Sequence, residues 1–133
     1  MEYLHPQEWQ RPRGYSHGVA ASGRFVFVAG QIATDHASNE VNSDDFAAQV
    51  KQALANTVEV LAAGGATPAH ICRMTWFITD MDAYKAAGAD IGPAYMETIG
   101  KHFPAITLVE VKSLIDPRAV IEVETVAVVP EQD

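Results

Sequence analysis

Residues 119–129 read AVIEVETVAVV, and this stretch has the clearest strand pattern in the chain. Because side chains alternate between the two faces of a β-strand, one face is apolar and the other has two carboxylates. The apolar face holds Ile121, Val123, Thr125 and Ala127, and the other holds Val120, Glu122, Glu124 and Val126. The acidic face is either a solvated outer surface or part of a subunit interface, where a carboxylate would act as a general base or hold a water.

Two short apolar runs, residues 18–21 and 24–29, lie on either side of Ser22-Gly23. Since glycine adopts positive φ without strain, this pattern predicts a β-hairpin with a tight turn. Residues 1–13 are polar and contain two prolines, so we expect an irregular arm there.

The clearest helix is predicted over residues 43–63, where apolar residues recur at three- and four-residue steps. Ser43 is a suitable N-cap, and Gly64-Gly65 predicts the end of the helix. A second helical region is predicted over residues 82–99, in which Pro93 fits best as the first residue of a second short helix.

Strands predicted over residues 70–79 and 105–111 complete the order β-β-α-β-α-β-β. Alternation along the first of them predicts that Ile71 faces away from Cys72 and Met74. Two helices on one face of a mixed, mostly antiparallel sheet make an α+β fold, and 133 residues fit a single domain. The other face of such a sheet needs a cover, and trimer formation would supply it.

Composition narrows the classes of function. The net charge of −8 and the lack of a basic run oppose nucleic-acid binding. No apolar run is long enough for a membrane span, and the polar start has no signal-peptide pattern, so we expect a cytoplasmic protein. The five histidines show no zinc-ligand spacing and Cys72 is expected to be a buried, inert thiol, so we predict no metal and no cofactor.

Several segments, in order along the chain, resemble the RidA/YjgF family of reactive intermediate deaminases. These are Tyr15-Ser16-His17 and residues 25–32, 49–65, 74–81, 103–105 and 121–128. The resemblance covers residues 15–129. It implies a chorismate-mutase-like fold and a homotrimer with three clefts between neighbouring subunits. In RidA itself, the cleft hydrolyses enamine and imine metabolites.

The resemblance also implies roles for individual residues. Tyr15 would line the pocket, Glu122 would position the attacking water, and main-chain groups of Gly30 and Gln31 would shape the cleft. The family arginine that binds a substrate carboxylate is replaced by Ile106, between Ala105 and Thr107. Isoleucine offers no charged fork, so activity on the usual small imino acids is in doubt. The candidates to supply a charge instead are Arg73, Lys101, His102 and Arg118.

Two functions follow from these residues. The first is a deaminase acting on a small enamine or imine with apolar character, of which 2-aminomuconate deaminases are the most concrete example. The second is a non-catalytic trimer that binds a metabolite in a degenerate site, as the loss of the arginine suggests. A ribonuclease activity, found in some relatives, fits poorly with the acidic charge.

Overall fold

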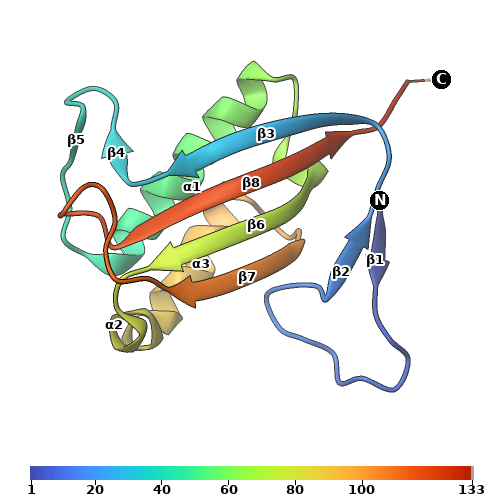
Figure 1. The fold of residues 1–133 in the computed structure, drawn as a ribbon, viewed down its shortest axis with the longest axis horizontal. Coiled ribbons are helices and arrows are strands. Elements are labelled where there is room, and N and C mark those ends of the chain that lie inside the picture. The colour runs from blue at the N-terminus through green and yellow to red at the C-terminus, as the bar shows by residue number, and fades with distance from the viewer. Residues whose placement is uncertain (133) are drawn as a thin grey trace.

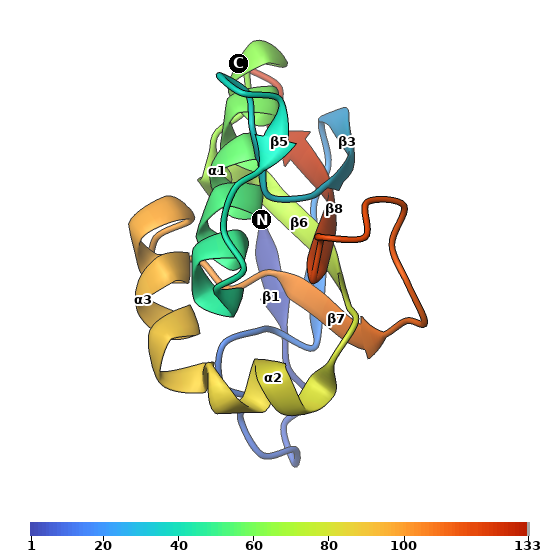
Figure 2. The same ribbon diagram turned by 90° about the vertical axis from the view of Figure 1, so that its left-hand side faces the viewer.

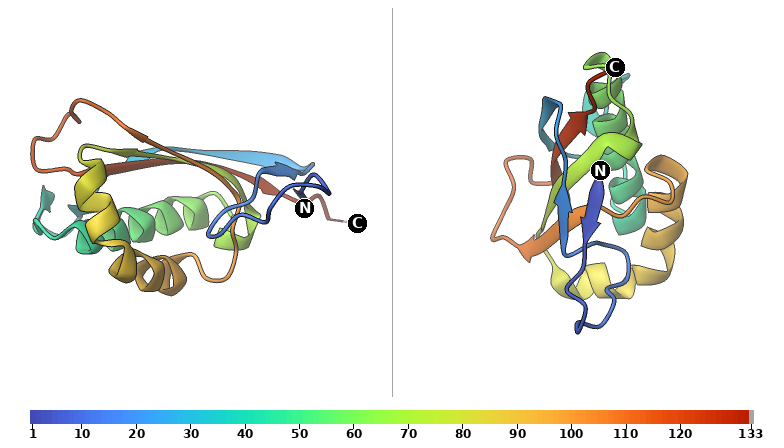
Figure 3. Two further views of the ribbon diagram at one scale, coloured as in Figure 1. Left: turned by 90° about the horizontal axis from the view of Figure 1, so that it is seen from below. Right: turned by 90° about the vertical axis from the view of Figure 1, so that its right-hand side faces the viewer.

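The computed structural model describes residues 1–132 and has a four-stranded sheet with helices on one face (Figures 1 and 3). The strands are β3 (Arg24–Gln31), β8 (Ile121–Val129), β6 (Ile71–Ile78) and β7 (Ala105–Glu110), in that spatial order. β8 pairs antiparallel with β3 and β6, whereas β6 and β7 are parallel. The predicted mixed, mostly antiparallel sheet is therefore confirmed.

Residues 1–132 form three α-helices instead of the two predicted. They are α1 (Phe46–Ala63), α2 (Met81–Ala86) and α3 (Gly88–Thr98). The helix α1 begins after Asp45, not Ser43, because the Asp45 carboxylate accepts a hydrogen bond from the Ala48 N–H at 2.9 Å. The second helical region breaks at Ala87, not at Pro93, which lies inside α3 on an exposed position.

The N-terminal segment differs from the prediction. Residues 1–13 are not wholly irregular, because β1 (Glu2–Leu4) pairs with β2 (Gly18–Ala20), and the predicted hairpin between residues 18–21 and 24–29 does not form. Gly23 lets the chain pass from β2 into β3: its φ is +145°, and an added Cβ would lie 2.1 Å from the Val129 carbonyl oxygen. Two small strands, β4 (Thr34–Asp35) and β5 (Glu40–Val41), and a 3-10 turn at Pro68–His70 complete the fold.

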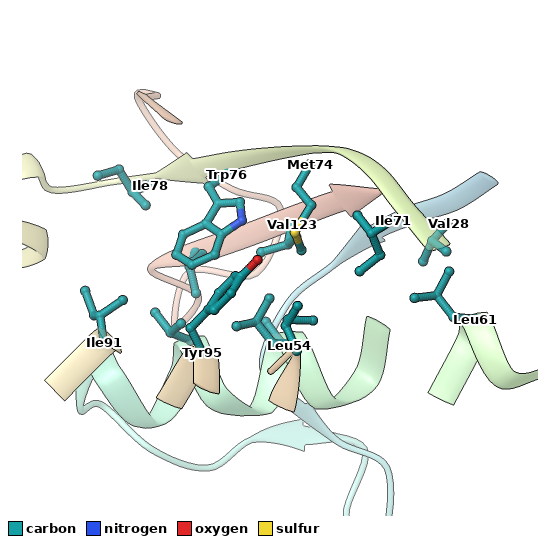
Figure 4. Close-up of a cluster of buried hydrophobic side chains, with 14 of the residues drawn as sticks. Val28, Leu54, Leu61, Ile71, Met74, Trp76, Ile78, Ile91, Tyr95 and Val123 are labelled. Carbon is teal, nitrogen blue, oxygen red and sulfur yellow. The ribbon is translucent and has the colours of Figure 1, made fainter. Parts of the chain in front are cut away.

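The core lies between the sheet and the helices (Figures 2 and 4). Leu54, Ile91 and Tyr95 of the helices pack against Met74, Trp76 and Val123 of the sheet. Ile71 is also fully buried in this core, contrary to the predicted alternation. The pairing of β6 with β8 shifts register between Ile71 and Arg73, so a bulge turns Ile71 to the same side as Met74.

The opposite face of the sheet has no helix over it, and we call it the open face (Figure 3). Phe25 and Phe27 of β3 are 55% and 72% exposed there, although aromatic side chains of this size are usually buried. They pair in the sheet with Val128 and Val126 of β8. Exposed aromatic side chains on one sheet face mark a surface suited to contact with another chain.

One buried amide connects α1 to the segment that leads into β8. Gln49 is 1% exposed. Its Nε2 donates to the carbonyls of Ser43 at 2.8 Å and Arg118 at 2.9 Å, and its Oε1 accepts from the Val120 N–H at 2.9 Å. These bonds fix the approach of the chain to Glu122.

Replacing Gln49 by alanine is expected to lower the free energy of unfolding by about 2–4 kcal/mol, because three backbone polar groups lose their hydrogen-bond partner in a single substitution. Urea denaturation followed by circular dichroism would measure the change. The matched control is Gln52→Ala, since Gln52 makes one side-chain bond to Asn56 in the same helix. A loss no larger than that of the control would contradict the role of Gln49.

Candidate functional site

A cavity of about 630 Å³ lies between the helix-facing side of the β6–β7 edge and helices α2 and α3. We call it the helix-side cavity. Its walls are mostly aromatic and aliphatic, which is typical of small-molecule sites of this volume. The side chains that form them include Tyr15, Trp76, Tyr84, Ile91, Tyr95, Phe103, Ile106 and Leu108.

Tyr15 reaches this cavity because the segment after β1 is fixed to the start of β7. The Ser16 N–H donates to the Pro104 carbonyl at 2.9 Å, and the Ser16 hydroxyl donates to the Phe103 carbonyl at 2.6 Å. A β-bridge joins Ser16 to Ala105. The ring of Tyr15 also meets His17 edge to face, with ring centroids 5.5 Å apart. These contacts hold Tyr15 beside the strand that carries Ile106.

The three predicted residues on β7 divide between the two faces of the sheet. Ile106 packs against the core and lines the helix-side cavity. Thr107 is exposed. It is the register partner of Thr75 on β6, so both side chains lie on the open face of the sheet. A smaller hollow of about 240 Å³ is bordered by Ala105, Ile106 and Thr107 together with Tyr15, Ser16, His17 and Arg73, so Arg73 lies near the predicted residues although it is outside the helix-side cavity.

Glu122, Gly30 and Gln31 form a second group, at the junction of β3 and β8. Glu122 is partly exposed on the open face, and its carboxylate lies over the backbone of Gly30. An added Cβ at Gly30 would be 1.9 Å from Glu122 Oε2, so this close approach requires glycine. The Gln31 amide donates to the Ala29 carbonyl at 3.1 Å. Glycine at position 30 therefore leaves room for the Glu122 carboxylate beside the backbone of β3.

The two groups do not meet within one chain. Ile106 pairs with Met74, and Met74 pairs with Thr125. Glu122 is therefore two strands away from Ile106, and it lies three residues before Thr125 on β8. With about 4.8 Å between strands and about 3.3 Å per residue, their Cα atoms are about 14 Å apart. Their side chains also point to opposite faces of the sheet. A site that uses both residues therefore needs a second copy of the chain.

The cations suggested by the sequence do not line the helix-side cavity. Arg73 lies on the open face, and Arg118 is paired with Asp44 at 3.0 Å. His102 is buried, with its ring nitrogens bound to the Tyr3 hydroxyl at 2.6 Å and the Ile71 carbonyl at 2.7 Å. Lys101 is exposed, and it is not among the residues of the cavity wall.

The cations at this cavity are Arg13 and Lys85, which the sequence analysis missed. Arg13 stands only two residues before Tyr15, so its proximity to the pocket was open to prediction once Tyr15 was assigned. Lys85 gave no such signal, because its place depends on the packing of α2.

Two titratable groups, Tyr95 in the cavity wall and Cys72 outside it, are unsuited to proton transfer near neutral pH. Burial raises the pKa of the Tyr95 hydroxyl, with a smaller contribution from Tyr3, so this phenol stays protonated. Burial also raises the pKa of the Cys72 thiol, which opposes a role as nucleophile. Within residues 1–132, no three His, Cys, Asp or Glu side chains are grouped so that they could hold a metal ion. None of the helices there is long and apolar enough to cross a membrane.

Comparison with known proteins identifies the family. The sequence model described as endoribonuclease L-PSP matches residues 8–129. A RutC family protein of Pyrococcus horikoshii is 33% identical over 128 residues, which cover 95% of this chain and 96% of the relative. The chain is a member of the RidA/YjgF family. A Rid-family protein of unknown function from Yersinia pestis, YyfB, has a crystal structure that matches with a TM-score of 0.83 at 32% identity, over 96% of this chain and 98% of that one.

A human relative in this comparison has an activity in its name. It is called 2-iminobutanoate/2-iminopropanoate deaminase and is 30% identical over 115 residues, which cover 86% of this chain and 79% of the human protein. The relatives of this chain thus include a protein named as an imine deaminase, whereas the matching family model is described as an endoribonuclease.

Proposed function

We propose that this RidA/YjgF chain is a deaminase that hydrolyses a small enamine or imine in a cleft shared by two subunits of a homotrimer. The observation that carries the proposal is the Glu122 carboxylate, which Gly30 accommodates on the open face of the sheet. No protein group among residues 1–132 donates a hydrogen bond to this carboxylate. It is therefore available to accept a proton from water.

The reaction follows from that geometry. Glu122 takes a proton from a water molecule as the water oxygen bonds to the carbon of the C=N group. Protonation of the nitrogen and collapse of the resulting carbinolamine then break the C–N bond, which releases ammonia and leaves a carbonyl product. An enamine enters the same path after protonation at carbon. No cofactor is needed for these steps.

The trimer is proposed on two grounds. Phe25 and Phe27 leave an exposed aromatic surface on the open face, next to the strand that carries Glu122. In addition, Glu122 and the helix-side cavity lie on opposite faces of one chain, so a neighbouring copy must supply one of them. The substrate is then a small metabolite with apolar character, for which a 2-aminomuconate-like compound is a concrete case.

The experiment is an ammonia-release assay on the full chain, with imines generated in situ from several amino acids by an amino-acid oxidase. We expect the chain to accelerate hydrolysis over the uncatalysed rate, and light scattering to give three times the chain mass of 14.4 kDa. A lone monomer, or rates equal to the uncatalysed ones for every imine, would contradict the proposal.

A second candidate is a non-catalytic trimer that binds a metabolite. Ile106 favours it, because an apolar side chain lines the cavity where the imine deaminases of the family have an arginine. Ligands that raise the melting temperature but are never converted would support this alternative. We do not propose a ribonuclease, since a net charge of −8 opposes binding of a phosphate backbone.

A further inference from the structure

The charge at the helix-side cavity is opposite to the charge of the chain. Acidic residues outnumber basic ones by 17 to 9 over the whole sequence. The only charged side chains that line the cavity, among residues 1–132, are the two cations Arg13 and Lys85. A local positive rim on an acidic protein concentrates small anions at that point of the surface.

Neither cation has an acidic partner in the described part of the chain. The ion pairs found there are Lys51 with Glu97 and Arg118 with Asp44. Gly14, with φ of +79°, makes the turn that sets Arg13 back from the anchored Ser16. On the other side, Glu110 accepts a hydrogen bond from the Met81 N–H at 2.8 Å and so fixes the start of α2, the helix of Lys85. Both cations are therefore free to bind an anion from outside.

Two glycines of α3 keep the cavity open. Gly88 and Gly92 are four residues apart, so they share one face of the helix, and both line the cavity. A Cβ added at either position would have no atom within 4 Å, and neither residue has positive φ. Gly92 lies inside α3, where glycine is less favourable than alanine, and neither packing nor backbone conformation requires glycine at position 88 or 92. The space above them is room for an occupant.

The remaining walls suit an apolar body with the flat shape of a ring. Aromatic residues make up 8% of the chain, yet five of them line this cavity. The rings of Tyr95 and Phe103 stack with centroids 5.6 Å apart, and Trp76 lies next to Tyr95 at 6.2 Å. Ile106 adds aliphatic surface. A compact, strongly hydrated ligand would gain little from such walls.

We propose that the helix-side cavity binds a small organic anion with an aromatic or similarly bulky apolar body, and that Arg13 and Lys85 bind its charged group. The body then lies over Gly88 and Gly92, against Ile106. This inference deepens the proposed function by naming the substrate class. The charge that Ile106 lacks is supplied by Arg13 and Lys85 at other points of the cavity wall, so the apolar side chain at position 106 serves selectivity for a larger substrate.

The test is a binding measurement without turnover. Isothermal titration would compare 3-phenylpropanoate with 3-phenylpropanamide, which keeps the ring and lacks the charge, and with acetate, which keeps the charge and lacks the ring. Comparison of the affinities of phenyl phosphate and 3-phenylpropanoate would show whether the cavity binds a phosphate or a carboxylate more tightly. We expect one of the two aromatic anions to bind at least tenfold more tightly than the amide and than acetate.

The variants are Arg13→Gln and Lys85→Gln, each expected to weaken the aromatic anion about tenfold and to leave the amide unchanged. Arg11→Gln and Lys112→Gln are the matched controls, because both residues are exposed and neither lines the cavity. Gly92→Leu, which fills the open space, should abolish binding of the aromatic anion and of the amide alike.

Equal affinity for the anion and the amide, no binding of any probe at millimolar concentration, or equal effects of Arg13→Gln and Arg11→Gln would overturn the inference. The outcome is separate from that of the deaminase assay. Charge-selective binding to a chain that releases no ammonia supports the ligand class and rejects the catalysis. Ammonia release that Arg13→Gln and Lys85→Gln leave unchanged supports the catalysis and rejects the ligand class.

Discussion

Replacing Glu122 by glutamine is expected to lower the rate of ammonia release by about 10²–10⁴-fold, the usual contribution of a positioned general base. Glutamine keeps the size of the side chain and its place over Gly30, but its amide does not take a proton from water. Steady-state kinetics should show the loss in kcat with KM nearly unchanged, because Glu122 is proposed to act on water and not on the substrate.

Two further variants make this prediction specific to the position of the carboxylate. Gly30→Ala should also lower kcat, since the new methyl group would lie 1.9 Å from Glu122 Oε2 and displace it. Glu124→Gln is the matched control: it removes the same charge two residues along the strand, where no glycine holds the carboxylate. If Glu122→Gln keeps more than half of the wild-type kcat, or if both glutamates matter equally, Glu122 is not the base.

Much of the sheet was predictable because β8 shows strict alternation. The pattern places Ile121, Val123 and Thr125 in the core, and all three are buried. The long helix α1 was equally clear, since its apolar face repeats over several turns. Its start was misplaced because Ser43 and Asp45 are both good caps, and the choice depends on which side chain reaches the N–H of the first turn.

The features that the sequence did not reveal depend on contacts between distant segments. The bulge at Ile71 arises from pairing with β8, and no local pattern marks it. The predicted hairpin between residues 18–21 and 24–29 has a suitable turn sequence, but it does not form because β3 pairs instead with the longer strand β8, from Arg24 to Gln31. The pairing of β1 with β2 similarly joins residues across a loop of irregular structure.

The candidate site shows the same division. Tyr15, Glu122 and Ile106 became candidates because the resemblance to the RidA/YjgF family marks their positions. Gly88 and Gly92 lie in the helical region predicted over residues 82–99, where glycine in a sequence indicates only a less stable helix, whereas the structure places both at an open cavity. That cavity exists only through the approach of α2 and α3 to the sheet edge, so sequence periodicity alone gives no access to it.

Two inactive variants are expected to restore activity to each other when they assemble together. Glu122→Gln lacks the base, and Gly92→Leu blocks the cavity, so a trimer of either one has no working cleft. If each cleft takes Glu122 from one subunit and the cavity from its neighbour, every trimer that contains both variants has one of its three clefts with both functions intact. Ammonia release from such mixed trimers should then return to about one third of the wild-type rate.

The measurement uses coexpression of the two variants with different affinity tags, so that only mixed trimers are purified. The control places both substitutions in one chain and coexpresses it with the wild type. In a shared cleft, mixed trimers with two wild-type chains keep one cleft of three and those with one wild-type chain keep none, so this control retains about one sixth of the activity, whereas a site built within one chain would retain about half. For the two single variants a site within one chain predicts no recovery at all, because every chain then carries a defect. Recovery of activity by the two single variants therefore indicates a shared cleft, and so does a control activity well below one half. Trimers that have not mixed carry only one of the two tags and are not purified, so a failure of mixing is not mistaken for either result.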